Sequence, residues 1–191
     1  MQAFLGVQRD VSKRRSFGNL EGQIKGADNL LTLSQWIAGQ FDPTLFWKDI
    51  EWVKKLWGGK LILKGILDAE DAKIAATTGA DAIVVSNHGG RQLDGTVSSI
   101  RALPEVRDAI GERIEVFFDG GVRSGQDVLK ALALGARGVF IGKAFAWALG
   151  AMGEAGVSLA LDIIRRELDV SMALCGLRDV KDASPAILRP A

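Results

Sequence analysis

From Gly59 onward the sequence repeats one unit: a short apolar run, a turn that carries polar residues, and then an amphipathic stretch. Apolar runs of this kind, without polar residues at alternate positions, are typical of parallel strands buried on both faces. The predicted strands are 61–64, 82–86, 114–119 and 138–141. The predicted helices are about 69–78, 97–110 and 126–134, with a longer one over about 144–168. This alternation predicts an α/β fold with a parallel sheet and right-handed crossovers.

Two architectures satisfy this pattern, an open doubly wound sheet and a section of a (β/α)8 barrel. Polar residues favour the barrel, because they stand at or just after the carboxyl ends of the strands, where a barrel builds its site. They are Lys64, Ser86-Asn87-His88, Asp119-Gly120-Gly121 and Gly142-Lys143. A closed barrel typically needs about 250 residues, whereas this chain has 191 residues and four clear strands. We therefore predict half of a (β/α)8 barrel over residues 42–191.

The N-terminal stretch, residues 1–41, is the least regular part of the chain. Glycines interrupt its polar segments and no helical stripe of useful length appears, which predicts a long loop or extension that precedes the half-barrel. Its basic triplet, Lys13-Arg14-Arg15, is either a solvated patch or a contact to an anionic membrane surface.

A helix is predicted to begin at Asp42-Pro43, since Asp can cap free N–H groups and Pro suits the first helical position. Apolar residues then recur at helical spacing, and Gly58-Gly59 ends the pattern. The recurring residues are Phe46, Ile50, Val53 and Trp57, and Leu45, Trp52 and Leu56 widen the stripe. Four tryptophans lie between Trp36 and Trp57, either as core residues or as an aromatic surface at a membrane or subunit interface.

The composition excludes several classes of protein. Lys and Arg number 24 against 23 Asp and Glu, so no basic excess indicates a nucleic-acid binder. One cysteine cannot form an internal disulfide, which favours a reducing, cytoplasmic interior, and one histidine cannot build a histidine-rich metal site. No apolar run approaches the roughly 20 residues that a membrane-spanning helix needs, so any membrane contact is expected to be peripheral.

The segment from Ser86 to Gly95 is the richest in chemistry. His88 stands three residues before Arg91, with two glycines between them that permit a tight turn. An imidazole can exchange a proton near neutral pH, and a guanidinium can hold a carboxylate with two parallel hydrogen bonds. The pair suits a small carboxylic acid that is deprotonated or oxidised at the neighbouring carbon; the alternative is a structural histidine beside a surface arginine.

A second segment, from Asp119 to Val128, joins a glycine-rich turn to the start of a helix that Ser124 and Asp127 can cap. Exposed N–H groups at such a start attract phosphate, and Arg123 adds a positive charge. Gly142 and Lys143 end the next strand, and barrels commonly hold phosphate between their last two strand-to-helix loops. Plain turn glycines with a surface Arg are the alternative. Lys64, at a strand end, could stabilise an anionic ring or developing negative charge.

These segments resemble the FMN-dependent α-hydroxy acid dehydrogenases and oxidases, in particular their bacterial L-lactate dehydrogenase branch. The resemblance rests on Leu63-Lys64-Gly65-Ile66, Ser86 to Asp94, Asp119 to Gly125, Ala133 to Ala136 and Trp47 to Trp52. It implies that the chain is the C-terminal half of the barrel, that FMN is the cofactor, and that a small L-2-hydroxy acid, foremost L-lactate, is oxidised to the 2-oxo acid. The loop before this half, mobile in many members, mediates attachment in membrane-associated ones.

The resemblance also implies a role for individual residues. His88 is the catalytic acid/base and Arg91 binds the substrate carboxylate. The implied FMN contacts are Lys64, Ser86, Asp119, Gly120, Gly121, Val122, Arg123, Gly142 and Lys143. Lys143 replaces the family's usual Arg, which predicts weaker retention of FMN, because an ammonium lacks the two-pronged geometry of a guanidinium.

The family's N-terminal half supplies active-site tyrosines and an aspartate that orients the catalytic histidine, whereas this chain contains no Tyr. We therefore expect half of a site, and a homo-oligomer or a complementary N-terminal half as partner. Two alternatives remain at this stage. One is a non-catalytic half-barrel that binds FMN or phosphate weakly or only pairs with another chain. The other is a phosphate-binding barrel enzyme without flavin, which the sequence from Asn87 to Arg91 disfavours.

Overall fold

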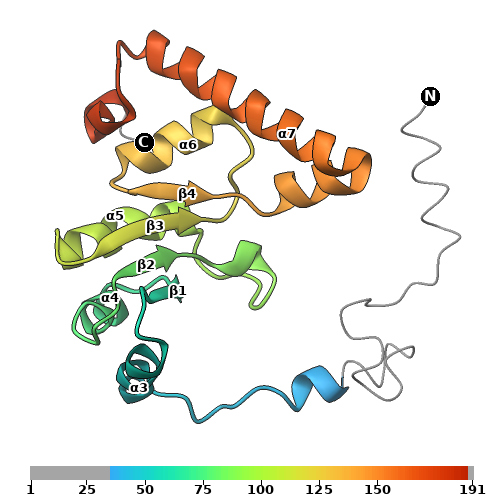
Figure 1. Ribbon diagram of the computed structural model, residues 1–191. Coiled ribbons are helices and arrows are strands. Elements are labelled where there is room, and N and C mark those ends of the chain that lie inside the picture. The colour runs from blue at the N-terminus through green and yellow to red at the C-terminus, as the bar shows by residue number, and fades with distance from the viewer. Residues whose placement is uncertain (1–34, 189–191) are drawn as a thin grey trace, which may run out of the picture. The chain divides into compact units, whose positions relative to one another are not determined.

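Four parallel strands form one sheet and lie side by side in chain order (Figure 1). They are β1 (Ile62–Ile66), β2 (Ala82–Val85), β3 (Glu115–Asp119) and β4 (Gly138–Phe140). The computed structural model describes residues 35–188. The predicted half-barrel, with four parallel strands and flanking helices, is therefore confirmed, whereas the predicted loop up to residue 34 and the triplet Lys13-Arg14-Arg15 lie outside the described residues.

Each strand is followed by a helix, as predicted. The helices are α4 (Ala69–Ala75), α5 (Ser99–Ile110), α6 (Gly125–Ala133) and α7 (Lys143–Leu174), and α3 (Trp47–Trp57) precedes β1. Asp68 caps α4 by accepting from the backbone N–H groups of Glu70 and Asp71 at 2.8 and 3.2 Å. Ser124 and Asp127 form the predicted capping box of α6.

The register of the strands separates the sheet into two different faces. Leu63, Ile83, Val85, Val116, Phe118 and Val139 belong to the hydrophobic core that the helices cover. On the other face, Lys64 pairs with Val84, Val84 with Phe117, and Asp119 with Phe140. We call this second side the inner face, since helices surround the outside of a barrel. Ile62 and Phe140, on the two edge strands, are 45% and 47% exposed there.

Two compact units divide the chain, Met1–Phe46 and Trp47–Ala191. In the described part of the first unit, the Asp42 carboxylate accepts hydrogen bonds from the backbone N–H and the hydroxyl of Thr44 at 2.9 and 2.6 Å. These bonds hold the pKa of Asp42 below its usual value. The predicted helix start at Asp42-Pro43 is wrong, because this side chain closes a local turn and the helix begins at Trp47.

The apolar stripe of α3 is exposed within the described structure. None of its residues is buried, and Trp52, Leu56 and Trp57 are 64–73% exposed. Only Trp47 packs against the core from one side. The prediction that the tryptophans fill a core therefore fails for Trp52 and Trp57, and the alternative of an aromatic surface remains.

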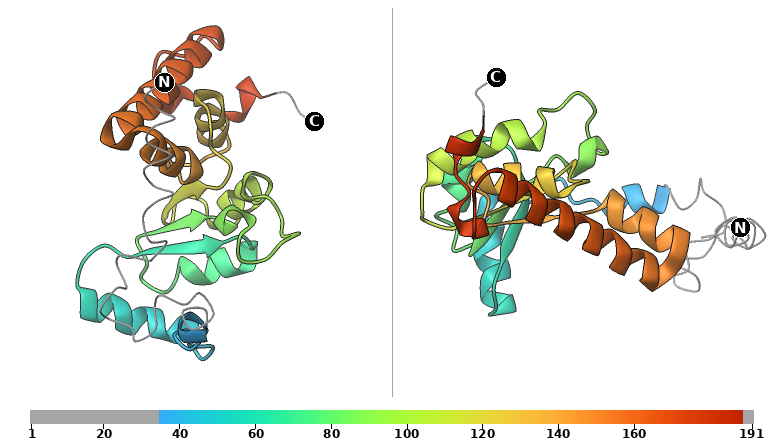
Figure 2. Two further views of the ribbon diagram at one scale, coloured as in Figure 1. Left: turned by 90° about the vertical axis from the view of Figure 1, so that its right-hand side faces the viewer. Right: turned by 90° about the horizontal axis from the view of Figure 1, so that it is seen from above.

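Helix α7 is longer than predicted and is broken near its middle. At Gly153 the backbone adopts φ 62° and ψ −143°, so two helical arms meet at an angle (Figures 1 and 2). By length and composition alone α7 could cross a membrane, contrary to the sequence-based expectation. The break leaves no straight rod over 143–174, however, and the second arm carries charged residues at 162, 165–167 and 169.

Candidate active site

A cavity of about 690 Å³ lies at the carboxyl ends of the four strands. Its lining residues come from Lys64 within β1, from the segments after β2 and β3, and from the junction of β4 with α7. It contains every predicted site residue except Ser86, namely Lys64, His88, Arg91, Asp119, Gly120, Gly121, Val122, Arg123, Gly142 and Lys143. The topology thus brings together side chains that are up to 79 positions apart, from Lys64 to Lys143. This is the rim where barrels build their sites.

The turn after β2 presents His88 in an unusual backbone conformation. At φ 57° it is the one residue other than glycine with a positive φ in the described chain, and Gly89 and Gly90 follow at 69° and 70°. A left-handed conformation costs an L-residue about 1–2 kcal/mol. Asn87 stabilises this turn, because its side-chain oxygen accepts from the Gly89 N–H at 3.0 Å. Strain of this kind clusters at functional sites.

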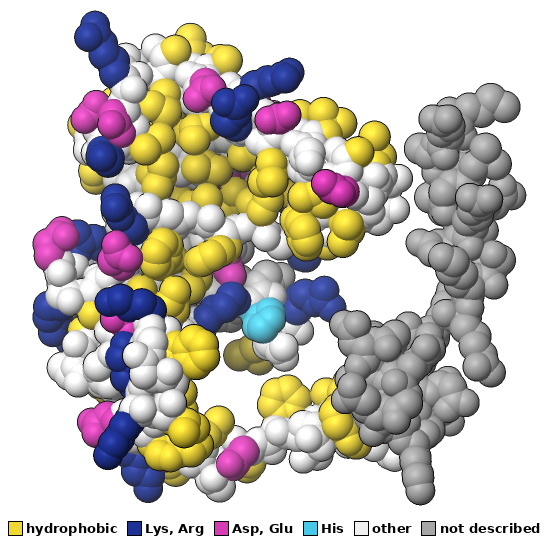
Figure 3. Space-filling model, in the orientation of Figure 1, with side chains coloured by type: hydrophobic (Ala, Val, Ile, Leu, Met, Phe, Trp, Pro, Cys, Tyr) yellow, Lys and Arg dark blue, Asp and Glu magenta, His cyan; other side chains and the backbone are white. Residues whose placement is uncertain are grey.

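The side chains of His88 and Arg91 are exposed, and neither makes an ion pair or a hydrogen bond within residues 35–188. Figure 3 shows the chain's single histidine at the surface with Lys and Arg side chains around it. An imidazole and a guanidinium without internal partners keep their hydrogen-bonding capacity for a ligand. The site can therefore hold an anion and exchange a proton beside it.

Lys64 lies at the inner face between two oxygen partners. Its ammonium donates to the Ser86 hydroxyl at 2.9 Å and pairs with the Asp119 carboxylate at 2.9 Å. Ser86 is 2% exposed, which explains why it does not line the cavity although it contacts a residue that does. Lys64 therefore keeps a fixed positive charge on the floor of the cavity.

The helix start that was expected to bind phosphate is already occupied by protein groups. At the N-terminus of α6, Asp127 accepts from the backbone N–H groups of Arg123 and Ser124, both at 3.0 Å. Glu167 from α7 accepts from the Gly125 N–H at 2.8 Å. Satisfied N–H groups beside two carboxylates attract a further anion less strongly, and the phosphate contact expected at this helix start stays a prediction.

The N-terminus of α7 offers the alternative. No side chain caps it at Gly142, and Lys143, Phe145 and Ala146 of its first turns line the cavity. The side chain of Arg123 faces the same cavity from the neighbouring turn. The positive charges and the free end of a helix dipole thus converge between the last two strand-to-helix turns.

A family model described as FMN-dependent dehydrogenase matches residues 5–190. The chain belongs to this family. It is 55% identical to the L-lactate dehydrogenase of Caulobacter vibrioides (strain NA1000 / CB15N) over 90% of this chain and 45% of that protein. It is 46% identical to the L-lactate dehydrogenase of Pseudomonas syringae pv. syringae (strain B728a) over 93% of this chain and 47% of that protein. The chain thus spans about half the length of the curated relatives it matches.

Solved structures agree with this assignment. A mandelate oxidase matches with a TM-score of 0.76 and 44% identity, covering 82% of this chain and 46% of that chain. An (S)-mandelate dehydrogenase, described as a monotopic membrane protein, matches with a TM-score of 0.79 and 37% identity, covering 85% of this chain and 43% of that chain. The resemblance drawn from the sequence is therefore confirmed.

The residues present fit the FMN that gives the FMN-dependent dehydrogenases their name. At Gly120 (φ 107°) a Cβ atom would collide with the Ser99 hydroxyl and lie 3.1 Å from the Asn87 side-chain oxygen, so a bare backbone is required there. Lys64 could neutralise an electron-rich ring, and Arg123 with Lys143 could hold a phosphate. Sequence reasoning missed Ser98 and Ser99, because nothing in the pattern of their segment distinguishes them from other polar residues at a helix start.

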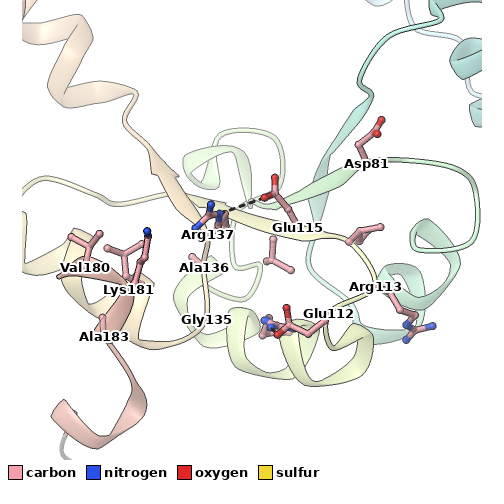
Figure 4. A pocket seen from close by; sticks show the side chains of 14 residues that line it. Asp81, Glu112, Arg113, Glu115, Gly135, Ala136, Arg137, Val180, Lys181 and Ala183 are labelled. Atoms are coloured by element: carbon pink, nitrogen blue, oxygen red, sulfur yellow. Dashed lines mark hydrogen bonds and ion pairs between the residues drawn. The ribbon is translucent and has the colours of Figure 1, made fainter.

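A second cavity of similar volume, about 690 Å³, lies at the opposite ends of the strands (Figure 4). Most of its charged residues have ion-pair partners: Glu115 pairs with Arg137 at 3.4 Å and Arg107 with Glu112, while Asp81 pairs with Lys54 and Lys60 outside the cavity. None of the predicted site residues lines this second cavity. Because barrels place catalysis at the carboxyl ends and stability at the other end, the first cavity is the candidate active site.

Proposed function

We propose that this chain is the FMN- and substrate-binding half of an enzyme that oxidises an L-2-hydroxy acid, foremost L-lactate, to the 2-oxo acid. The observation that carries the proposal is the single cavity that Lys64, His88 and Arg91 line together with Arg123 and Lys143. The high identity to L-lactate dehydrogenases supports the choice of L-lactate.

The chemistry divides between the substrate-binding and the cofactor-binding parts of the cavity. Oxidation of the hydroxyl-bearing carbon releases two protons and two electrons. FMN, when bound, supplies the acceptor for the electron pair together with the second proton. Neutral His88 accepts the first proton, while Arg91 holds the substrate carboxylate with two parallel hydrogen bonds and orients the reacting carbon. Lys64 stabilises negative charge that develops beside it.

The cofactor's phosphate would be held by Arg123, Lys143 and the open start of α7. Asp119, Gly120, Gly121 and Val122 would hold the part of FMN between its ring and its phosphate, and Ser86 would help to hold the ring. Lys143 gives a point charge where an arginine would give two directed donors. We therefore expect Lys143→Arg to tighten FMN binding, measured by quenching of flavin fluorescence.

The partner that completes the enzyme is a complementary half-barrel of the same family, or a second copy of this chain. The support is physical, because β1 and β4 are edge strands, and Ile62 and Phe140 on them are 45% and 47% exposed. For location we propose the cytoplasm with at most a peripheral membrane contact. The membrane-associated relative supports that contact, and the expected attachment loop in 1–41 lies mostly outside the described residues.

The test is a spectroscopic titration of the full chain, alone and mixed with the remaining half of a lactate dehydrogenase relative. We expect bound flavin absorbance in the mixture, and bleaching of that absorbance when L-lactate is added without oxygen. His88→Ala should abolish bleaching while FMN remains bound, and Arg91→Ala should raise the lactate concentration needed. Flavin that binds but never bleaches would favour the alternative of a non-catalytic half-barrel, and an entirely colourless mixture would refute the proposal.

A further inference from the structure

The backbone of His88 is held by a buried hydroxyl. The His88 N–H donates to the Ser86 Oγ at 3.1 Å, two residues back along the chain, and Ser86 is 2% exposed. His88 is also the non-glycine residue that adopts a positive φ in the described chain. An L-residue keeps an unfavourable backbone conformation only where its surroundings stabilise that conformation. The hydrogen bond from the His88 N–H to Ser86 is a contact that can stabilise it.

The hydroxyl of Ser86 is itself held from the inner face. Lys64 Nζ donates to the same Oγ at 2.9 Å and is paired with Asp119 at 2.9 Å. The two lone pairs of the oxygen are thus used by the ammonium and by the His88 N–H, which fixes the direction in which the oxygen accepts. Charged groups strengthen such hydrogen bonds, so the ion pair stabilises the acceptor that His88 uses.

We propose that Ser86, fixed by the Lys64–Asp119 ion pair, is a positioning residue that holds His88 in its left-handed conformation and so directs the imidazole into the cavity. The inference rests on the proposed function for the role of His88 in proton transfer. It adds that the charge beside the ring site and the proton acceptor are linked through one hydroxyl, so a change at Lys64 also changes the geometry at His88.

The chain offers a direct test, because His88 is its one histidine. Selective 15N-histidine labelling of the full chain, without flavin, gives one backbone amide signal, whose solvent exchange rate reports the hydrogen bond to Ser86. Ser86→Ala should accelerate this exchange by roughly 2- to 10-fold, the equivalent of one hydrogen bond, and should shift the signal. Lys64→Met, at a half-exposed side chain, should produce a smaller change in the same direction.

Two controls separate positioning from general destabilisation. Ser171→Ala removes a hydroxyl that bonds to the Glu167 carbonyl within α7, and should leave the His88 signal unchanged. The amide of Gly89, held by Asn87 rather than by Ser86, is observed in a uniformly 15N-labelled sample as the reference and should keep its exchange rate.

Equal acceleration at His88 and Gly89 would mean simple loosening of the turn and would overturn the proposal, as would an unchanged His88 rate in Ser86→Ala. If Ser86→Ala does not fold, Lys64→Met decides: an unchanged His88 rate there removes the ion pair from the argument. Since no flavin is present, a failed FMN titration would refute the proposed function and leave this measurement intact.

Discussion

Asp81 joins three consecutive segments at the end of the sheet opposite the candidate active site. Its carboxylate pairs with Lys54 of α3 and with Lys60 before β1, and it accepts from the Leu61 N–H at 2.8 Å. These donors hold the pKa of Asp81 well below its usual range, and the same contact raises the pKa of Lys60. Asp81 therefore anchors α3 and the entry into β1 while the carboxyl ends of the strands remain free for ligands.

This shift of pKa predicts an acid-dependent stability. Because the folded-state pKa of Asp81 lies below the unfolded value of about 3.9, its contribution is present above that pH and is lost as the pH falls through the folded-state pKa. We expect Asp81→Asn to lower the unfolding midpoint at pH 7 and to lessen its further fall toward pH 2, measured by urea denaturation. Asp162→Asn, which loosens an exposed pair with Arg165 at 3.8 Å, is the control and should follow the wild type. Parallel pH profiles for wild type and Asp81→Asn would contradict the assignment.

Sequence reasoning reached many of the site residues because strand ends are visible in an amino-acid pattern. Lys64, His88 and Asp119 each follow a run of apolar residues, and parallel strands must end on the same rim. The hydrogen-bond partners of backbone N–H groups cannot be recognised from the amino-acid pattern. Glu167 lies 42 positions from the Gly125 N–H that donates to it, so only the packing of α7 on α6 could show that this N–H already has a partner.

Among the elements, the strands and all the helices were predictable, but the start of α3 and the break in α7 were not. Helices α4 to α6 pack on a continuous core, so the apolar periodicity of each segment was enough to predict a helix with one buried face. The start of α3 depended on whether Asp42 caps a helix or closes a turn, and both use the same side-chain oxygen. The break in α7 depended on Gly153, one of several glycines in that helix, and glycine alone does not specify a kink.

Replacing a glycine by alanine is expected to have opposite effects on stability in the two arms of α7. Gly156 is buried, and a Cβ there would collide with the Ala148 carbonyl oxygen and lie 2.9 Å from the Met152 Cβ. Gly156→Ala should destabilise the fold by about 1–3 kcal/mol through overpacking. Gly150 has open space around it, so Gly150→Ala should stabilise by up to about 1 kcal/mol through helix propensity. Urea denaturation of both variants measures the two signs, and a gain of stability in Gly156→Ala would show that the arms do not pack closely.

For the whole molecule, the decisive property is that the inner face of the sheet is buried at Ala82 and Val84 of β2 but exposed on the two edge strands. Parallel sheets normally have both faces covered, yet Ile62, Phe140 and the apolar side of α3 remain exposed in the described structure. The apolar runs in the sequence indicate that each strand is to be buried. They do not show whether this chain or another chain covers the strand. The relatives are about twice as long as the segment that they share with this chain, which provides the material for such a cover.

Two edge strands that expose apolar side chains on the inner face predict association. We expect the purified chain to show a concentration-dependent mass above its own 20.4 kDa in sedimentation experiments, since edge strands and exposed apolar surface both promote pairing. Ile62→Lys places a charge on the inner face at the β1 edge and should shift the distribution toward the monomer. Leu174→Lys is the matched control, because Leu174 is 84% exposed at the end of α7, and should associate as the wild type does. If the remaining half of a lactate dehydrogenase relative is added, it should compete with self-association in the wild type and bind less well to Ile62→Lys. A wild-type chain that stays monomeric at every concentration, and ignores the added half, would show that the inner face needs no cover.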